Sequence, residues 1–156
     1  MPTELPNIAA VLAAVLQRVP REQQPLLIAF AERLAADRYR GWAERFDDGD
    51  TKASLFACAK REEEIATLIE DLYPAAKSLQ QKILAAHPDL LEVNETLFAP
   101  LELEQQLALQ AQGERLGAAT WRAFAQHATD AKARDAFLAC APLEEESADF
   151  LETLRP

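Results

Sequence analysis

The chain has 156 residues, 49% of them apolar, and its 26 acidic side chains outnumber 16 basic ones to give a formal charge of −10. This length and apolar content describe one globular domain over residues 1–156. The chain contains only four glycines, and its 31 alanines and 23 leucines far outnumber four valines and five isoleucines. Because Ala and Leu favour helices, the composition predicts an all-α fold and excludes β-barrels, sandwiches and glycine-rich nucleotide-binding folds.

The charge balance also limits the partners and the setting of the protein. An acidic surface without a basic stripe repels phosphate groups, so we expect no nucleic-acid binding and no docking on an anionic membrane. The most apolar N-terminal run, Ile8 to Leu16, is too short to span a bilayer and lacks the features of a secretory signal. We therefore expect a cytoplasmic protein with two reduced cysteines, Cys58 and Cys140.

An internal repeat organises the chain. Shifted by 82 positions, residues 22–74 align with residues 104–156 without a gap. The matched stretches are Glu-Arg-Leu at 32–34 and 114–116, Ala-Cys-Ala at 57–59 and 139–141, and Glu-Glu-Glu at 62–64 and 144–146. Shared alanine and leucine do not explain such matches. The chain is therefore a duplication, with copies at residues 1–74 and 83–156 and a spacer at 75–82.

Each copy is predicted to form a helical hairpin with a short helical lead-in. The long helices are expected at about 21–46, 52–73, 101–128 and 131–154, with a short helix at 75–86 and a loop around 87–89. Asp50 or Thr51 is expected to cap the second long helix, and Pro74 to end it. Two antiparallel pairs joined by a long connection favour a four-helix bundle. The alternatives are a TPR-like solenoid, which a single repetition disfavours, and an irregular helical bundle.

Glutamates interrupt the apolar stripes of all four long helices. Glu32 and Glu114 occupy equivalent stripe positions in the first and third helices, and the two Glu-Glu-Glu runs cross the apolar faces of the second and fourth. Helical geometry turns at least one Glu of each run inward. Because an isolated buried carboxylate is costly, it must be protonated, pair with a cation or bind a metal. One inward Glu from each of four helices suits two bridged iron or manganese ions.

Aromatic residues follow the stripe glutamates at a fixed spacing. Tyr39 stands seven residues after Glu32, Trp121 stands seven after Glu114, and further glutamates follow 30 to 32 residues downstream in both copies. Over residues 21–156 this pattern resembles the ferritin-like superfamily, which includes rubrerythrins and bacterioferritins. The resemblance implies a ferritin-like four-helix bundle built from two tandem helical hairpins with a long crossover. It also implies the metal ligands Glu32, Glu63, Glu114 and Glu145, with Glu62 and Glu144 as alternates.

The chain departs from the family's metal motif. In the family, the second and fourth helices carry Glu-x-x-His, but here Ala, Ile or Ser stands three residues after each candidate Glu. The histidines of this sequence are His87, in the crossover, and His127, at the end of the third long helix. Carboxylates without nitrogen ligands bind divalent ions more weakly. The resemblance therefore implies a degenerate di-metal site in a non-catalytic binding, sensing or interaction protein rather than an enzyme.

Two other functions stay open. A carboxylate-ligated di-iron or di-manganese oxidoreductase, or an iron-binding protein, would use the four glutamates with Tyr39 or Trp121 as a redox-active aromatic. A structural or adaptor bundle would instead present an apolar outer surface to a partner. We expect a homodimer, and no cofactor unless iron or manganese occupies the glutamates.

The same residues also have simpler interpretations. The stripe glutamates and the glutamate runs can pair with Arg33 and Arg115 or with Arg40 and Arg122, or they can face solvent. Cys58 and Cys140 occupy equivalent positions in the two copies, where they can meet across the core as a redox pair or as soft metal ligands. Alternatively, they are small buried residues that let helices approach closely, which is the commoner role of cysteine.

Overall fold

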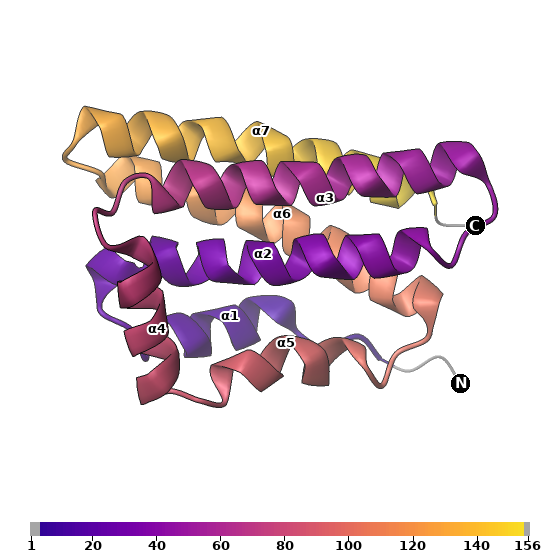
Figure 1. Ribbon diagram of the computed structural model, residues 1–156, viewed down its shortest axis with the longest axis horizontal. Coiled ribbons are helices and arrows are strands. Elements are labelled where there is room, and N and C mark those ends of the chain that lie inside the picture. Colours follow the sequence, from indigo (N-terminus) through magenta and orange to yellow (C-terminus); the bar gives the residue numbers. More distant parts are fainter. Residues whose placement is uncertain (1–3, 155–156) are drawn as a thin grey trace.

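The computed structural model describes residues 4–154, and this part of the chain consists of helices and connecting turns, without strands (Figure 1). The elements are α1 (Ile8–Leu16), the 3₁₀ helix η1 (Arg21–Gln23), α2 (Gln24–Ala43), α3 (Gly49–Glu70), α4 (Ala76–Ala86), α5 (Leu90–Phe98), α6 (Leu103–His127) and α7 (Ala131–Thr153). The all-α prediction is confirmed. No helix in the described range is long and apolar enough to cross a membrane. Residues 1–3 and 155–156 of the predicted domain lie outside this range.

The long helices form two antiparallel pairs. α2 lies beside α3, α6 lies beside α7, and α3 also packs against α7 (Figure 1). Pro25 is tolerated because it lies in the first turn of α2, where backbone N–H groups have no partner within the helix. The pairs therefore follow the two copies of the repeat.

Helix ends differ from the predicted bounds by a few residues. α3 begins at Gly49 because Asp48 caps it, and the Asp48 side chain accepts a hydrogen bond of 2.9 Å from the Thr51 backbone N–H. The predicted caps, Asp50 and Thr51, instead lie inside the first turn. From Arg45 the backbone N–H groups donate to residues three positions back, so α2 ends before the predicted residue 46.

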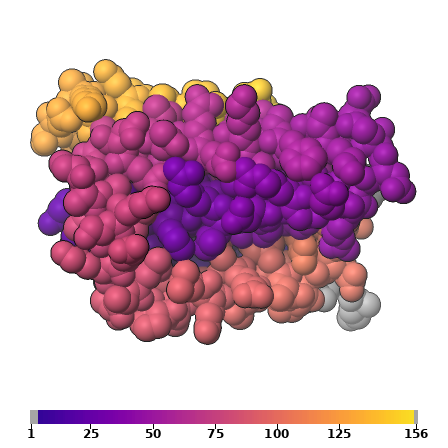
Figure 2. Space-filling model, viewed as in Figure 1, coloured from indigo at the N-terminus to yellow at the C-terminus, as the bar shows by residue number. Residues whose placement is uncertain are grey.

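The short helices α1 and α5 are equivalent lead-ins. Both bounds of α5 lie 82 positions after those of α1, so the register of the repeat extends to them. They lie together beneath α2 and α6 in Figure 1, joined at one end by an ion pair from Arg18 to Asp89 at 2.6 Å. Figure 2 shows α2, α3, α4 and α5 sharing one face of the molecule.

The buried apolar residues form two main clusters, one toward each end of the long helices. The first includes Tyr39, Trp42, Leu55 and Leu109, and the second includes Ile28, Ile65, Trp121 and Phe137. Each long helix passes from one cluster to the other, and at the crossing point it carries a buried glutamate, namely Glu32, Glu62, Glu114 or Glu144. The fold thus places a layer of carboxyl groups between two apolar layers.

Candidate functional site

One glutamate from each long helix is buried. The exposed fractions are 9% for Glu32, 0% for Glu62, 1% for Glu114 and 1% for Glu144. These positions are equivalent in pairs across the repeat and are separated by 30 residues within each copy. Oxygens of Glu32, Glu62 and Glu144 all lie within 4.8 Å of one another. Three carboxyl groups from three helices thus converge, with Glu114 beside them.

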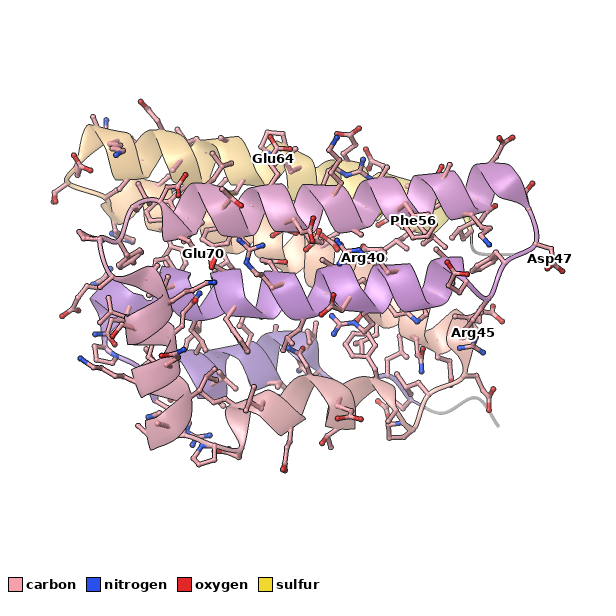
Figure 3. All side chains as sticks on the ribbon, viewed as in Figure 1. Arg40, Arg45, Asp47, Phe56, Glu64 and Glu70 are labelled. Atoms are coloured by element: carbon pink, nitrogen blue, oxygen red, sulfur yellow. The ribbon has the colours of Figure 1, made fainter. Side chains whose placement is uncertain are left out.

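The structure corrects the choice of residues on the second and fourth helices. Glu63 and Glu145 point outward, with side chains 44% and 39% exposed, and form equivalent ion pairs with Arg40 and Arg122. In Figure 3, Arg40 lies between α2 and α3. Glu62 and Glu144, proposed as alternates, are the inward residues. Spacing alone does not separate the two residues, because Glu62 follows the buried Cys58 by four positions and Glu63 follows the buried Ala59 by four.

Aromatic and amide side chains donate hydrogen bonds to the buried carboxylates. The Tyr39 hydroxyl donates to Glu114 Oε1 at 2.6 Å, and Gln110 Nε2 donates to the same oxygen at 2.8 Å. Trp121 Nε1 donates to Glu144 Oε1 at 2.8 Å. Tyr39 and Trp121, singled out from their spacing, therefore both contact buried glutamates. Gln110 was missed because its repeat equivalent is the apolar Ile28.

Several carboxylate oxygens have no donor. Both oxygens of Glu62 and the Oε2 atom of Glu114 are buried without a hydrogen-bond partner. An unpaired buried carboxylate oxygen loses its hydration and gains nothing in exchange. Glu62 and Glu32 approach closely enough to hydrogen bond once one of them carries a proton. These oxygens therefore need either protons or a cation.

Arg38 supplies positive charge beside the glutamates. Its guanidinium lies 4.0 Å from the centre of the Phe98 ring and donates a 2.9 Å hydrogen bond to Gln110 Oε1. Gln110 in turn donates to Glu114, so the arginine is linked to the carboxylates through one amide. One arginine does not balance four carboxyl groups. Sequence reasoning missed Arg38 because its repeat equivalent, Thr120, is uncharged.

Burial shifts the titration of the converging carboxyl groups. It raises the pKa of Glu32 and, more strongly, the pKa values of Glu62 and Glu144 above their usual range. Repulsion from neighbouring glutamates, including Glu114, adds to the increase. Each shift favours the protonated form. In the absence of a cation, Glu32, Glu62 and Glu144 therefore hold protons more tightly than exposed glutamates do.

The positions that carry histidine in the ferritin-like motif hold other groups here. Ile65 follows Glu62 by three residues and is fully buried in apolar surroundings. Ser147 follows Glu144 by three residues, and its hydroxyl accepts a 2.9 Å hydrogen bond from Arg61 Nε. Both places are therefore filled by groups that offer no nitrogen ligand. A second guanidinium stands close to one of them.

The two histidines lie elsewhere. His87 Nδ1 lies 3.1 Å from Arg18 at the junction of α1 and α5, and His127 is the last residue of α6. Neither is among the described groups that could share a metal ion with the buried glutamates. Any metal bound at these glutamates would therefore take oxygen ligands from the protein.

The cysteines are buried free thiols in different apolar clusters. Cys58 belongs to the first cluster and Cys140 to the second. Burial raises the pKa of Cys58 and raises that of Cys140 to about 12. A thiol with a raised pKa is a weak nucleophile at neutral pH. The arrangement favours the interpretation of both cysteines as packing residues.

A cavity of about 160 Å³ reaches the carboxyl layer from the side of α1 and α5. Glu32, Glu114 and Glu144 line it together with Arg38 and Gln110, and apolar side chains form most of its remaining wall. Glu32, Glu114 and Glu144 are therefore accessible to a small molecule or ion without separation of the long helices, whereas Glu62 does not line the cavity.

Comparisons of the chain with protein-family models, curated proteins and solved structures find no significant match. The resemblance to ferritin-like proteins therefore stays a prediction from the spacing of residues in this sequence.

Gly117 provides space for Glu144. A Cβ atom at Gly117 would lie 2.6 Å from Glu144 Oε1, whereas one at Gly113 would meet nothing within 4 Å. We expect Gly113→Ala to stabilise the protein by about 0.5–1 kcal/mol through helix propensity. We expect Gly117→Ala to destabilise it by ~1–2 kcal/mol, because displacing the carboxylate breaks its bond from Trp121. Urea unfolding of both variants checks this, and equal stabilisation by the two substitutions would contradict the tight fit.

The raised pKa of Glu62 predicts a pH dependence of stability. Its usual pKa lies near 4.5, and the folded state raises it. The stabilising contribution is therefore complete below the usual value and lost as pH rises through the folded-state pKa. In chelator-treated protein, Glu62→Gln should flatten the fall in unfolding free energy between about pH 5 and pH 8. It should also raise stability at pH 8 by ~1–3 kcal/mol, since an amide carries no buried charge.

Glu63→Gln is the matched control for this pH measurement. It removes the same charge one residue away, from a side chain that is 44% exposed and paired with Arg40. Equal slopes in the Glu62→Gln variant and the unsubstituted protein would show that Glu62 is not held protonated by the fold.

Proposed function

We propose that this chain is a ferritin-like four-helix bundle whose glutamate layer binds a divalent metal ion through carboxylate oxygens. The observation that carries the proposal is the convergence of Glu32, Glu62 and Glu144, with both Glu62 oxygens buried and lacking a donor. Manganese(II), iron(II) and magnesium accept such hard oxygen ligands. A bound ion would supply positive charge that Arg38 alone does not provide to the four carboxyl groups.

The residues beside the buried glutamates suit one divalent metal ion better than two. The two histidine positions of the family motif are filled by apolar Ile65 and by Ser147, whose hydroxyl is engaged by Arg61. A guanidinium beside the second position disfavours another cation there by electrostatic repulsion. We therefore infer a stoichiometry of one ion per chain.

The replaced nitrogen ligands and the contacts of Tyr39 and Trp121 favour a binding or sensing role over oxidoreductase chemistry. Iron enzymes are tuned by the ligands and their hydrogen-bonded surroundings, and here the nitrogen ligands of the family are replaced. Tyr39 and Trp121 each donate a hydrogen bond to a carboxylate, which positions Glu114 and Glu144. Their contacts support a role in holding the ligands in place.

The homodimer and the cytoplasmic location stay predictions, as does the adaptor alternative. Phe56 and Leu138 occupy equivalent positions of the repeat and are 41% and 47% exposed. Such isolated apolar residues are common on protein surfaces. They do not by themselves favour an adaptor over a metal-binding protein.

Manganese titration tests the proposed function. Isothermal titration calorimetry of chelator-treated protein at pH 7.5 should give about one Mn(II) per chain, because three carboxylates converge on one point. Glu62→Gln should weaken binding at least about tenfold, since an amide oxygen lacks the charge of a carboxylate. Glu63→Gln should leave the affinity within about twofold, because exposed pairs contribute little.

Three results would contradict this proposal. Two ions per chain would mean an intact di-metal centre rather than a degenerate one. Absence of Mn(II) binding would mean that protons alone satisfy the buried carboxyl groups, and an equal loss of affinity in the Glu62→Gln and Glu63→Gln variants would mean that the ion does not bind specifically at the buried glutamates. Thermal unfolding of each variant distinguishes lost binding from lost folding.

A further inference from the structure

The cavity beside the glutamate layer has an apolar wall built from four helices. α1 and α5 form its outer side, while α2 and α6 form its inner side. Val11, Leu12, Val15 and Leu97 are among the lining side chains. Its volume of about 160 Å³ is close to that of an engineered apolar cavity, roughly 150 Å³, that holds benzene. The space therefore suits an aliphatic chain or ring of about six carbons.

α1 covers this cavity without filling it. All nine residues of α1 are apolar, yet none of them is fully buried, although five of them line the cavity. A helix of this composition ordinarily buries its apolar face against its neighbours. α1 contacts α6, and Ile8, Val15 and Leu16 pack against buried clusters. The cavity still leaves part of this apolar face without the contacts that an apolar molecule would supply.

The inner end of the cavity is acidic. Glu32, Glu114 and Glu144 line it, each at least nine-tenths buried, against the single positive charge of Arg38. Oε2 of Glu114 has no hydrogen-bond partner. Arg38 already donates a hydrogen bond to Gln110 and stacks on Phe98. Its guanidinium is therefore only partly available to the carboxylates. This end of the cavity therefore needs hydrogen-bond donors that carry positive charge.

We propose that the cavity binds a small apolar amine in its protonated form. The hydrocarbon part would lie against α1 and α5, and the ammonium group would donate to Glu114 and its neighbours at the inner end. An ammonium offers three donors and no acceptor, which suits unpartnered carboxylate oxygens. A carboxylic acid of the same length would place a second anion beside the glutamates, and an alcohol would offer one uncharged donor.

The amine proposal does not depend on metal binding, although the two sites share Glu32 and Glu144. The ammonium and a divalent ion would both use carboxylates of the layer, so they should compete. The amine proposal does not require metal, however, and is tested on chelator-treated protein. Failure of Mn(II) to bind would leave it standing, and failure of the amine to bind would leave the metal proposal standing.

Three six-carbon probes test the proposal. Calorimetric titration at pH 7.5 with n-hexylammonium chloride, 1-hexanol and sodium hexanoate compares head groups on one hydrocarbon chain. We expect hexylammonium to bind at least about tenfold more tightly than hexanol, because charge-assisted hydrogen bonds are the stronger ones, and hexanoate to show no binding. Equal affinity of hexylammonium and hexanol, tighter binding of hexanoate, or no binding of any probe would overturn the proposal.

Two glycine substitutions test whether the ligand binds in the cavity. Gly113 lines it, Gly41 does not, and a Cβ at either position meets no atom within 4 Å. Gly113→Leu should fill the space and weaken hexylammonium binding at least about tenfold, whereas Gly41→Leu should leave it unchanged. Amide chemical-shift mapping on the unsubstituted protein provides the second measurement. Shifts at Gly113 and Gly117 support the site, and shifts confined to other regions overturn it.

Discussion

The burial of four carboxyl groups beside too little positive charge is the constraint on which the rest of this structure depends. Desolvation of a carboxylate costs several kcal/mol unless protons, donors or cations compensate. The chain meets part of that need through Tyr39, Gln110 and Trp121, each of which donates to a buried glutamate. Gly117 leaves room for one carboxylate. Both oxygens of Glu62 still have no hydrogen-bond partner, and we interpret these oxygens as part of a cation site.

The two copies of the repeat form equivalent ion pairs at the surface but differ in the residues around the buried glutamates. Equivalent ion pairs hold each helix pair together, with Arg40 bound to Glu63 and Arg122 bound to Glu145. Inside, the two halves have diverged, and the non-equivalent groups are those that contact the buried glutamates or line the cavity. Their repeat pairs are Arg38 with Thr120, Ile28 with Gln110, and Ala35 with Gly117. Such divergence breaks the internal symmetry at the site, which gives the cavity an acidic inner end and one arginine.

The helical fold and the existence of inward glutamates could be predicted, because both depend on periodicity that a duplicated sequence shows twice. The stripe positions of Glu32 and Glu114 allowed either an inward site or a salt bridge at the edge of the stripe, and the structure shows both residues buried. The choice between Glu62 and Glu63 was not clear, since consecutive residues differ by only 100° around a helix and three glutamates stand together. The cavity was beyond prediction, because it depends on how the lead-in helices α1 and α5 lie against α2 and α6. Arg38 and Gln110 act through contacts made between residues 72 positions apart.

X-ray diffraction from crystals grown with Mn(II), with data collected at the manganese absorption edge, tests the central claim most directly. The account predicts one anomalous peak per chain, with Glu32, Glu62 and Glu144 oxygens as its ligands. No peak there, with these carboxyl groups instead hydrogen bonded to one another at short distances, would contradict it and would show that the buried layer is satisfied by protons alone.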